Sequence, residues 1–116
     1  MNIQIFGTKK CFDTKKAERF FKERNIKYQL IDLKEKDMSR GELQSVISSL
    51  GGIDKVINPN TKDKQTLTLM EYLLPDDKFE KLLDNQQLLI TPIVRNGKKA
   101  TIGVQSDIWS QWIEGK

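Results

Sequence analysis

Hydrophobic and polar positions alternate at the start of the chain and then change to a helical spacing. The alternation over residues 2–6 predicts a strand. Residues 14–23 carry apolar side chains three and four positions apart, which predicts an amphipathic helix capped by Asp13 or Thr14. The residues of its apolar face are Ala17, Phe20 and Phe21. Residues 28–33 predict a second strand, and this order predicts a right-handed β-α-β unit with parallel strands.

A second amphipathic helix is predicted in the middle of the chain, after a charged loop. Ser39 and Glu42 have the spacing of a capping box, in which each residue satisfies a backbone N–H group at the start of the helix. The apolar residues of this helix are Leu43, Val46, Ile47 and Leu50. Gly51 and Gly52 follow, and glycine is the residue most typical of the position just past a helix.

The next segment mixes irregular and helical patterns. Residues 53–66 are polar and predict irregular structure, with a turn at 58–60. Residues 67–74 predict a short apolar helix that ends at Pro75. The two aspartates at 76–77 predict the cap of a further helix. The apolar residues of that helix are Phe79, Leu82 and Leu83.

The end of the chain has the pattern of a β-hairpin followed by a helix. Residues 88–95 lead into the Asn-Gly pair at 96–97, the strongest short-range hairpin signal, and residues 100–104 predict the returning strand. Ser106 or Asp107 is expected to cap the last helix. The apolar residues of this helix, expected in the core, are Ile108, Trp109, Trp112 and Ile113. The whole pattern predicts one domain over residues 1–116, with a helical insert at about 39–86.

Composition narrows the classes of function. Of the 116 residues, 37% are hydrophobic and 31% charged, which is typical of a globular chain. The net charge of +4 comes from bases interleaved with acids, so we expect no direct binding of nucleic acid. No apolar run is long enough to span a membrane. A single cysteine excludes an internal disulfide and favours the cytoplasm. With one cysteine and no histidine, a zinc site has no plausible ligand set, we expect no metal site, and histidine-dependent catalysis is excluded.

Cys11, the only cysteine, lies between the first predicted strand and the first predicted helix. A helix N-terminus favours an anion, and lysines flank Cys11 on both sides, so both effects favour the nucleophilic thiolate. Asp13 opposes the lysines if it lies close. Four lysines surround the thiol: Lys9, Lys10, Lys15 and Lys16. A second cysteine of a C-x-x-C pair would fall at Thr14, so any redox chemistry uses one protein thiol and a partner thiol from outside.

Several motifs resemble those of the ArsC/Spx family, over the length of the chain. These motifs are Cys11-x-x-x-Lys15-Lys16-Ala17, the stretch from Lys34-Glu35-Lys36 to Ser39, and Thr91-Pro92-Ile93-Val94 followed by Ile102-Gly103. The resemblance implies a thioredoxin-like α/β fold: a four-stranded mixed sheet with a helical insertion. It also implies a cis peptide before Pro92 that faces the thiol.

The sequence departs from both branches of this family. The arsenate reductases carry three arginines that hold the oxyanion, but this chain has Thr91 before the proline, no arginine near 58–60, and Val104 and Gln105 after Gly103. Lysine does not replace the bidentate arginine donors well, so the anion site looks absent. The Spx-type regulators sense oxidants with a C-x-x-C pair, which Thr14 interrupts.

The resemblance favours an arsenate reductase-like, single-thiol oxidoreductase. Cys11 would form a mixed disulfide, resolved by a small thiol such as glutathione or bacillithiol, or by a partner glutaredoxin. The supporting site residues are Thr14, Lys10, Lys15, Thr91 and Pro92. Thr14 would cap the helix or donate a hydrogen bond to the thiolate. We expect no bound cofactor, and a monomer.

Two alternatives remain at this point. The first is an Spx-like, non-enzymatic regulator that binds RNA polymerase, through its α subunit, or another protein; Gly52 would form the contact, although a glycine pair after a helix also has an ordinary capping role. The second is arsenate reduction in which lysines and backbone N–H groups replace the missing arginines.

Overall fold

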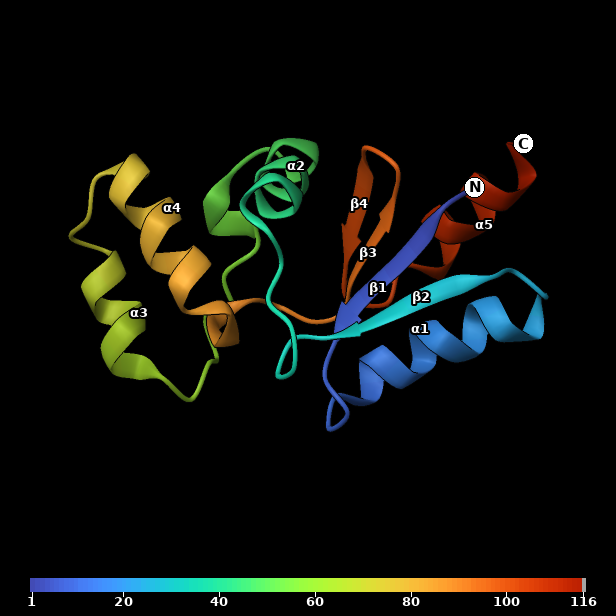
Figure 1. Cartoon of the computed structure of the whole chain (residues 1–116), viewed down its shortest axis with the longest axis horizontal. Helices are drawn as coiled ribbons and strands as arrows, with labels where there is room; N and C mark the ends of the chain where they lie inside the picture. The colour runs from blue at the N-terminus through green and yellow to red at the C-terminus, as the bar shows by residue number, and fades with distance from the viewer. Residues whose placement is uncertain (116) are drawn as a thin grey trace.

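A four-stranded mixed sheet forms one half of the molecule, and a group of helices forms the other half (Figure 1). The computed structural model describes residues 1–115. The elements in chain order are β1 (Ile3–Gly7), α1 (Phe12–Glu23), β2 (Tyr28–Asp32), α2 (Arg40–Leu50), the 3-10 helix η1 (Ile53–Lys55), α3 (Lys64–Met70), α4 (Pro75–Asp84), the 3-10 helix η2 (Gln86–Leu88), β3 (Ile93–Asn96), β4 (Lys99–Ile102) and α5 (Ser106–Glu114). No helix in this part of the chain is long and apolar enough to cross a membrane.

The sheet has the strand order β2-β1-β3-β4. β1 pairs in parallel with β2, as the β-α-β pattern predicted, and Ile5 lies opposite Leu30. β1 also pairs antiparallel with β3, where Ile5 lies opposite Val94, and β3 pairs antiparallel with β4. The Asn-Gly hairpin is confirmed, with Gly97 at the positive φ of 61° that its turn requires.

One face of the sheet is covered by α1 and α5 (Figure 1). The buried residues of this face are Ile3, Ile5, Ala17, Phe20, Phe21, Val94 and Trp109. Trp109 is fully buried, and its indole N–H donates to the Thr101 hydroxyl at 2.8 Å, so the polar edge of the ring is satisfied. The expected core role of the apolar residues of the last helix is confirmed for Trp109, while Trp112 and Ile113 pack partly buried beside it. The prediction is wrong for Ile108, which lies on the exposed face of α5.

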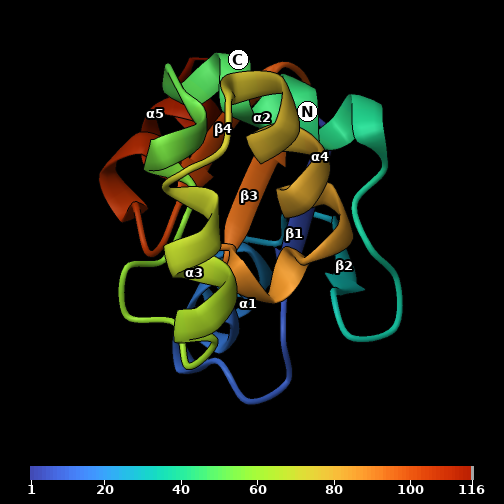
Figure 2. The same ribbon diagram turned by 90° about the vertical axis from the view of Figure 1, so that its left-hand side faces the viewer.

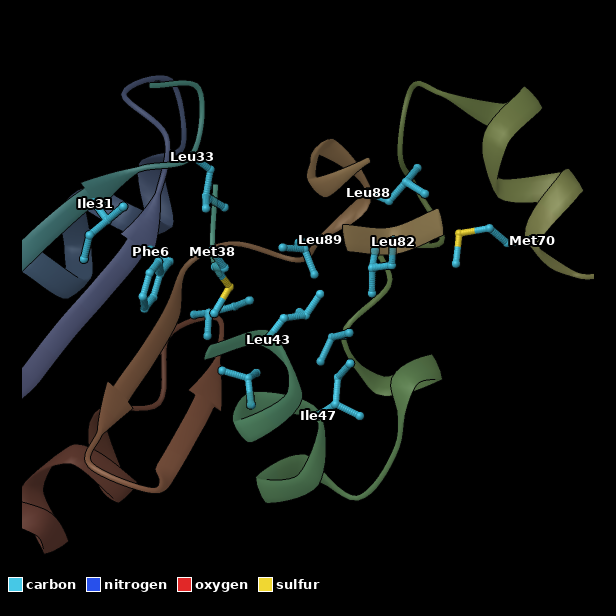
Figure 3. Packing of buried hydrophobic residues seen from close by; sticks show 13 residues of the cluster. Phe6, Ile31, Leu33, Met38, Leu43, Ile47, Met70, Leu82, Leu88 and Leu89 are labelled. Atoms are coloured by element: carbon cyan, nitrogen blue, oxygen red, sulfur yellow. The ribbon is translucent and has the colours of Figure 1, made fainter. Parts of the chain in front are cut away.

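The opposite face of the sheet packs against the helices of residues 40–88, which include α2, in a continuous apolar cluster (Figure 3). Phe6 and Ile31 contribute from the sheet, and Leu43 and Leu82 contribute from the helices. Gln86 is buried in η2, where its side chain accepts from Met38 N–H at 2.7 Å and donates to Met38 C=O at 2.9 Å. These bonds tie the segment after β2 to η2, which fixes the helical half to the sheet half.

The structure corrects several predicted helix boundaries. α1 begins at Phe12 with Cys11 as its N-cap, so neither Asp13 nor Thr14 caps it; both lie in its first turn. Leu74 stands at the N-cap of α4 and the aspartates at 76–77 lie in its first turn. Pro75 does not end a helix but begins α4, because proline has no N–H group to lose at the first helical position.

Other boundaries differ by smaller shifts. α3 begins at Lys64, earlier than predicted, because the side chain of Asp63 accepts from Thr66 N–H at 3.1 Å and starts the helix. Gln105, and neither Ser106 nor Asp107, is the N-cap of α5. The capping box of α2 is confirmed, and Gly51 ends that helix in the left-handed conformation, at a φ of 87°. Figure 2 shows α3 and α4 side by side, in front of the sheet.

Candidate functional site

The Cys11 thiol lies at the N-terminus of α1, beside the loop that enters β3. Thr91 makes two contacts with it: the Thr91 hydroxyl donates to Cys11 Sγ at 3.2 Å, and the thiol donates to the Thr91 carbonyl at 3.7 Å. The peptide bond between Thr91 and Pro92 is cis, as the resemblance implied. Two segments that are 80 positions apart in the sequence therefore meet at the sulfur atom.

The pKa of Cys11 is lower than that of an ordinary thiol. Burial of the half-buried sulfur is the largest single effect and raises the pKa. Hydrogen bonds from the side chains of Thr14 and Thr91 and from the backbone of Thr14 and Asp13 stabilise the thiolate and together outweigh that burial. The net result favours the nucleophilic form of the sulfur.

Thr14 lies in the first turn of α1, three residues after Cys11, and is buried. Its hydroxyl is fully covered and has no hydrogen-bond partner of normal length among the described residues. Thr91 is therefore the side chain whose hydroxyl contacts the sulfur at hydrogen-bond distance, whereas the Thr14 hydroxyl lowers the pKa of Cys11 by its proximity, without a hydrogen bond of normal length. Gly7 makes room for it, because a Cβ at Gly7 would lie 2.2 Å from Thr14 Oγ1. The predicted capping role of Thr14 is wrong, and its other predicted role, as a donor to the thiolate, stays a prediction.

The lysines beside Cys11 lie on the exposed rim of the site. Lys9 pairs with Glu35 at 3.6 Å, and Lys16 pairs with Asp13 at 3.8 Å. The Lys15 ammonium lies 5.7 Å from the centre of the Phe12 ring, and Lys10 is exposed. The groups that lower the Cys11 pKa are hydrogen-bond donors rather than these lysines. Roles for Lys10 and Lys15 at the site stay predictions.

A polar cleft of about 710 Å³ opens beside the thiol. Thr8 and Thr91, which are hydrogen-bonded to Cys11, line this cleft, although Cys11 itself does not. The segment after β2 and the helical half supply most of the other lining residues. Its lining residues are Thr8, Leu33, Lys34, Asp37, Asn58, Asn60, Thr61, Lys62, Asp63, Asp84, Gln86, Gln87, Leu89 and Thr91. Sequence analysis noted the turn at 58–60 but missed the cleft, because its residues come from separate segments and follow no motif.

No arginine lines this cleft. Arg95, the arginine nearest to Pro92 in the sequence, donates to Gln4 Oε1 at 2.8 Å and lies 3.8 Å from a carboxylate oxygen of Glu42. Arg40 pairs with Glu80 in the helical half. The predicted lack of an arginine anion site stays a prediction.

Gly52 and Phe12 both lie outside the cleft lining. Gly52 follows α2 outside the cleft lining, and a Cβ added there would meet no atom within 4 Å, so its surroundings are open. Phe12, next to Cys11 in the sequence, is 76% exposed, and sequence analysis assigned it no role. Within residues 1–115 no group of three or more metal-ligating side chains is close enough to hold a metal ion.

Comparisons with known proteins place this geometry in a family. The sequence pattern of the ArsC family matches residues 6–112. The chain is 28% identical to the global transcriptional regulator Spx 2 of Oceanobacillus iheyensis, over all of this chain and 87% of that protein. It is 24% identical to the uncharacterized protein YusI of Bacillus subtilis, over 92% of this chain and 94% of that protein.

The fold is also that of solved structures. An arsenate reductase from Vibrio cholerae superposes with a TM-score of 0.79 at 22% identity, over 93% of this chain and 94% of that one, which shows a shared fold. The predicted thioredoxin-like α/β architecture with a four-stranded mixed sheet is confirmed. With the family pattern covering nearly its whole length, this chain belongs to the ArsC family.

Proposed function

We propose that this protein is a single-thiol oxidoreductase that acts on disulfides through Cys11. One observation carries the proposal: the Thr91 hydroxyl donates to the Cys11 sulfur at 3.2 Å, at the open N-terminus of α1. Hydrogen bonding of this kind stabilises a thiolate, and the thiolate is the species that attacks a disulfide. The lowered pKa of Cys11 supports the same assignment.

The reaction proceeds by three thiol-disulfide exchanges. The Cys11 thiolate attacks one sulfur of the substrate disulfide, the S–S bond breaks, and the other substrate sulfur leaves as a thiolate that takes a proton from water. A low-molecular-weight thiol such as glutathione then attacks the mixed disulfide and releases Cys11. A second molecule of that thiol completes the reduction, so two small thiols are oxidised to one disulfide for each substrate disulfide reduced.

The resolving thiol comes from outside because the chain supplies none. Cys11 is the only cysteine, and position 14 is a buried threonine. A small thiol or a partner glutaredoxin fills this role in the proposal, and the reducing cytoplasm is the compartment that provides it. Disulfides are proposed as substrates rather than arsenate, because no arginine lines the cleft to hold an oxyanion.

The proposal is tested by mixing the protein with oxidised glutathione and following the intact mass. We expect one glutathione adduct on the wild type, none on Cys11→Ser, and release of the adduct when reduced glutathione is added. The rate is compared with that of the same chain unfolded in urea. A folded protein that reacts no faster than the unfolded chain would refute the proposed activity.

A second candidate function has support from Gly52. The open space around this residue suits a contact with another protein, and curated relatives carry the name global transcriptional regulator Spx. In this alternative the chain binds the α subunit of RNA polymerase, with Cys11 as a sensor or a relic.

Capture of the purified α subunit tests the alternative, with two substitutions at one position. Gly52 has a φ of 153°, so any side chain there strains the backbone. Gly52→Ala carries this strain without bulk, whereas Gly52→Arg adds bulk and charge. The alternative predicts that the wild type and Gly52→Ala retain the α subunit and that Gly52→Arg loses it; no capture by the wild type would exclude it.

A further inference from the structure

We propose that the polar cleft beside Cys11 binds an extended segment of polypeptide, so that the substrate is a disulfide of a peptide or protein. This inference rests on the proposed function, because it names the substrate class for the same thiol. It follows from the size and position of the cleft, from the chemistry of its lining, and from an exposed aromatic ring next to Cys11 in the sequence.

The cleft extends well beyond the thiol. Its volume of about 710 Å³ lies within the range of sites that hold molecules much larger than an inorganic oxyanion. Thr91 at one end contacts the Cys11 sulfur, whereas Asn60 and Lys62 line the cleft from the helical half. Cys11 does not itself line the cleft, so a ligand that fills it reaches from Thr91 to the segment after η1 and must extend past Thr91 to meet the sulfur, as a chain that carries a reacting cysteine would.

The lining is rich in the groups that bind a peptide backbone. Side-chain amides present an acceptor oxygen and N–H donors, which match the N–H and C=O groups of a polypeptide, and hydroxyls both donate and accept. The amides are those of Asn58, Asn60 and Gln87, and the hydroxyls are those of Thr8, Thr61 and Thr91. The Gln86 amide also lines the cleft but is already bonded to Met38 and Leu83. Such a set gives many neutral contacts along the length of a ligand, where an oxyanion needs a few concentrated charges.

Part of this lining is held in place before any ligand arrives. The Gln87 side chain donates to a carboxylate oxygen of Asp63 at 3.1 Å, and Asp63 also accepts from Thr66 N–H at 3.1 Å. The carbonyl oxygen of the Asn58 side chain accepts from Asn60 N–H at 2.9 Å, which fixes the turn at the rim of the cleft. Groups that are already ordered lose less conformational entropy on binding.

The charges of the cleft disfavour a small anion. The carboxylates of Asp37, Asp63 and Asp84 exceed the ammonium groups of Lys34 and Lys62. Hydrogen bonds from Thr66 and Gln87 lower the pKa of Asp63, because they stabilise the ionised carboxylate. The net negative charge of the cleft would repel an oxyanion, whereas it would not repel an uncharged or weakly basic polypeptide.

Phe12 adds an apolar contact outside the cleft. Its ring is 76% exposed, directly follows Cys11 and is not part of the cleft lining. A substrate held in the cleft with its sulfur at Cys11 would bring a neighbouring side chain toward this ring. Exposed aromatic rings are enriched where proteins contact one another.

The test uses two disulfides with the same reacting bond. One is a blocked, uncharged octapeptide whose central cysteine is joined to 2-mercaptoethanol, and the other is N-acetylcysteinamide joined to the same thiol. The second-order rate of adduct formation on Cys11 is measured for both by quenched-flow mass spectrometry. We expect the octapeptide to react at least about tenfold faster, a factor that two or three neutral hydrogen bonds supply.

Variants locate the source of that preference. Asn60→Ala and Phe12→Ala should each lower the ratio of the two rate constants by at least about threefold, as expected for the loss of one contact. Gln44→Ala is the matched control, since Gln44 is exposed on α2 outside the cleft and its loss should change neither rate.

The outcomes separate this inference from the function on which it rests. If the octapeptide and the small disulfide react equally fast with the folded protein, the thiol is reactive and the peptide inference alone is overturned. If neither disulfide reacts faster with the folded protein than with the urea-unfolded chain, the proposed function fails and the inference falls with it. If Asn60→Ala and Phe12→Ala both leave the preference for the octapeptide unchanged, the inference is also overturned.

Discussion

The N-termini of α1 and α2 differ in what their unpaired backbone N–H groups bind. At α2, the Ser39 hydroxyl accepts from Glu42 N–H at 3.2 Å, and the Glu42 carboxylate accepts from Ser39 N–H at 2.9 Å. At α1, the N-cap is Cys11, and no side chain closes the end of the helix. The backbone of Asp13 and Thr14 acts on the sulfur instead and lowers its pKa.

The difference separates a helix end that serves stability from one that serves chemistry. The first N–H groups of a helix have no partner within the helix, so they bind a capping side chain or remain available to an anion. At α2 the capping box satisfies two N–H groups, those of Ser39 and Glu42. The cysteine of α1 leaves the N–H groups of its own helix for the thiolate, and Thr91 arrives from the β3 side as a further donor.

Cys11→Ser gives the largest expected effect, because it removes the thiol and converts the α1 cap to the residue type found at α2. We expect complete loss of the glutathione adduct. Serine is also a preferred cap, so the free energy of unfolding should rise by up to about 1 kcal/mol. Intact mass and urea denaturation measure the two results, and a variant that is clearly less stable than the wild type would show that Cys11 already caps the helix well.

Thr91→Val tests the donor that α2 lacks. Valine keeps the shape of threonine but cannot donate to the Cys11 sulfur, so the pKa of Cys11 should rise. The alkylation rate at neutral pH should fall by about three- to tenfold, the range expected for one hydrogen bond to a charged group. Thr68→Val, at an exposed position of α3, is the matched control and should leave the rate unchanged. An unchanged rate in Thr91→Val would show that the Thr91 hydroxyl does not stabilise the Cys11 thiolate.

Ser39→Ala removes the side-chain cap from the N-terminus of α2. The loss of the capping box should lower the free energy of unfolding by about 1 kcal/mol, measured by urea denaturation. The alkylation rate of Cys11 should stay the same, because Ser39 makes no contact with the thiol site. A large change in that rate would mean that the two helix ends are coupled.

The smallest effect is a pH dependence of stability. Because the pKa of Cys11 is lowered in the folded state, the folded protein binds fewer protons than the unfolded chain between the two pKa values. The free energy of unfolding of the wild type should therefore rise relative to Cys11→Ser as pH increases through that interval. Below the folded pKa the thiol is protonated in both states and the contribution vanishes. A difference between wild type and variant that falls as pH rises would have the wrong sign.

The local patterns of the sequence predicted most of the fold. The β-α-β unit, the α2 capping box and the Asn-Gly hairpin depend on neighbouring residues, and all three are confirmed. The helix starts were harder, because they depend on competition between nearby residues. Pro75 could end one helix or begin the next, and the structure places it at the first position of α4.

The site was predicted in part. The position of Cys11 before a helix and the place of Thr91 beside it came from motifs, yet the hydrogen bond between them joins residues far apart in the sequence. The lysines near Cys11 were an obvious signal in the sequence, but they lie at the exposed rim, where charges are screened by solvent. The cleft could not be predicted, because its walls come from segments that meet only when the helical half packs on the sheet.

The pH dependence of Cys11 alkylation tests the central claim most directly. The folded wild-type protein and the same chain in urea are labelled with iodoacetamide over a range of pH, and the apparent pKa of the thiol is read from each profile. The open N-terminus of α1 and the Thr91 donor predict a lower pKa in the folded protein than in the unfolded chain. A folded pKa equal to or above the unfolded one would contradict the account, because the site would then not stabilise the thiolate.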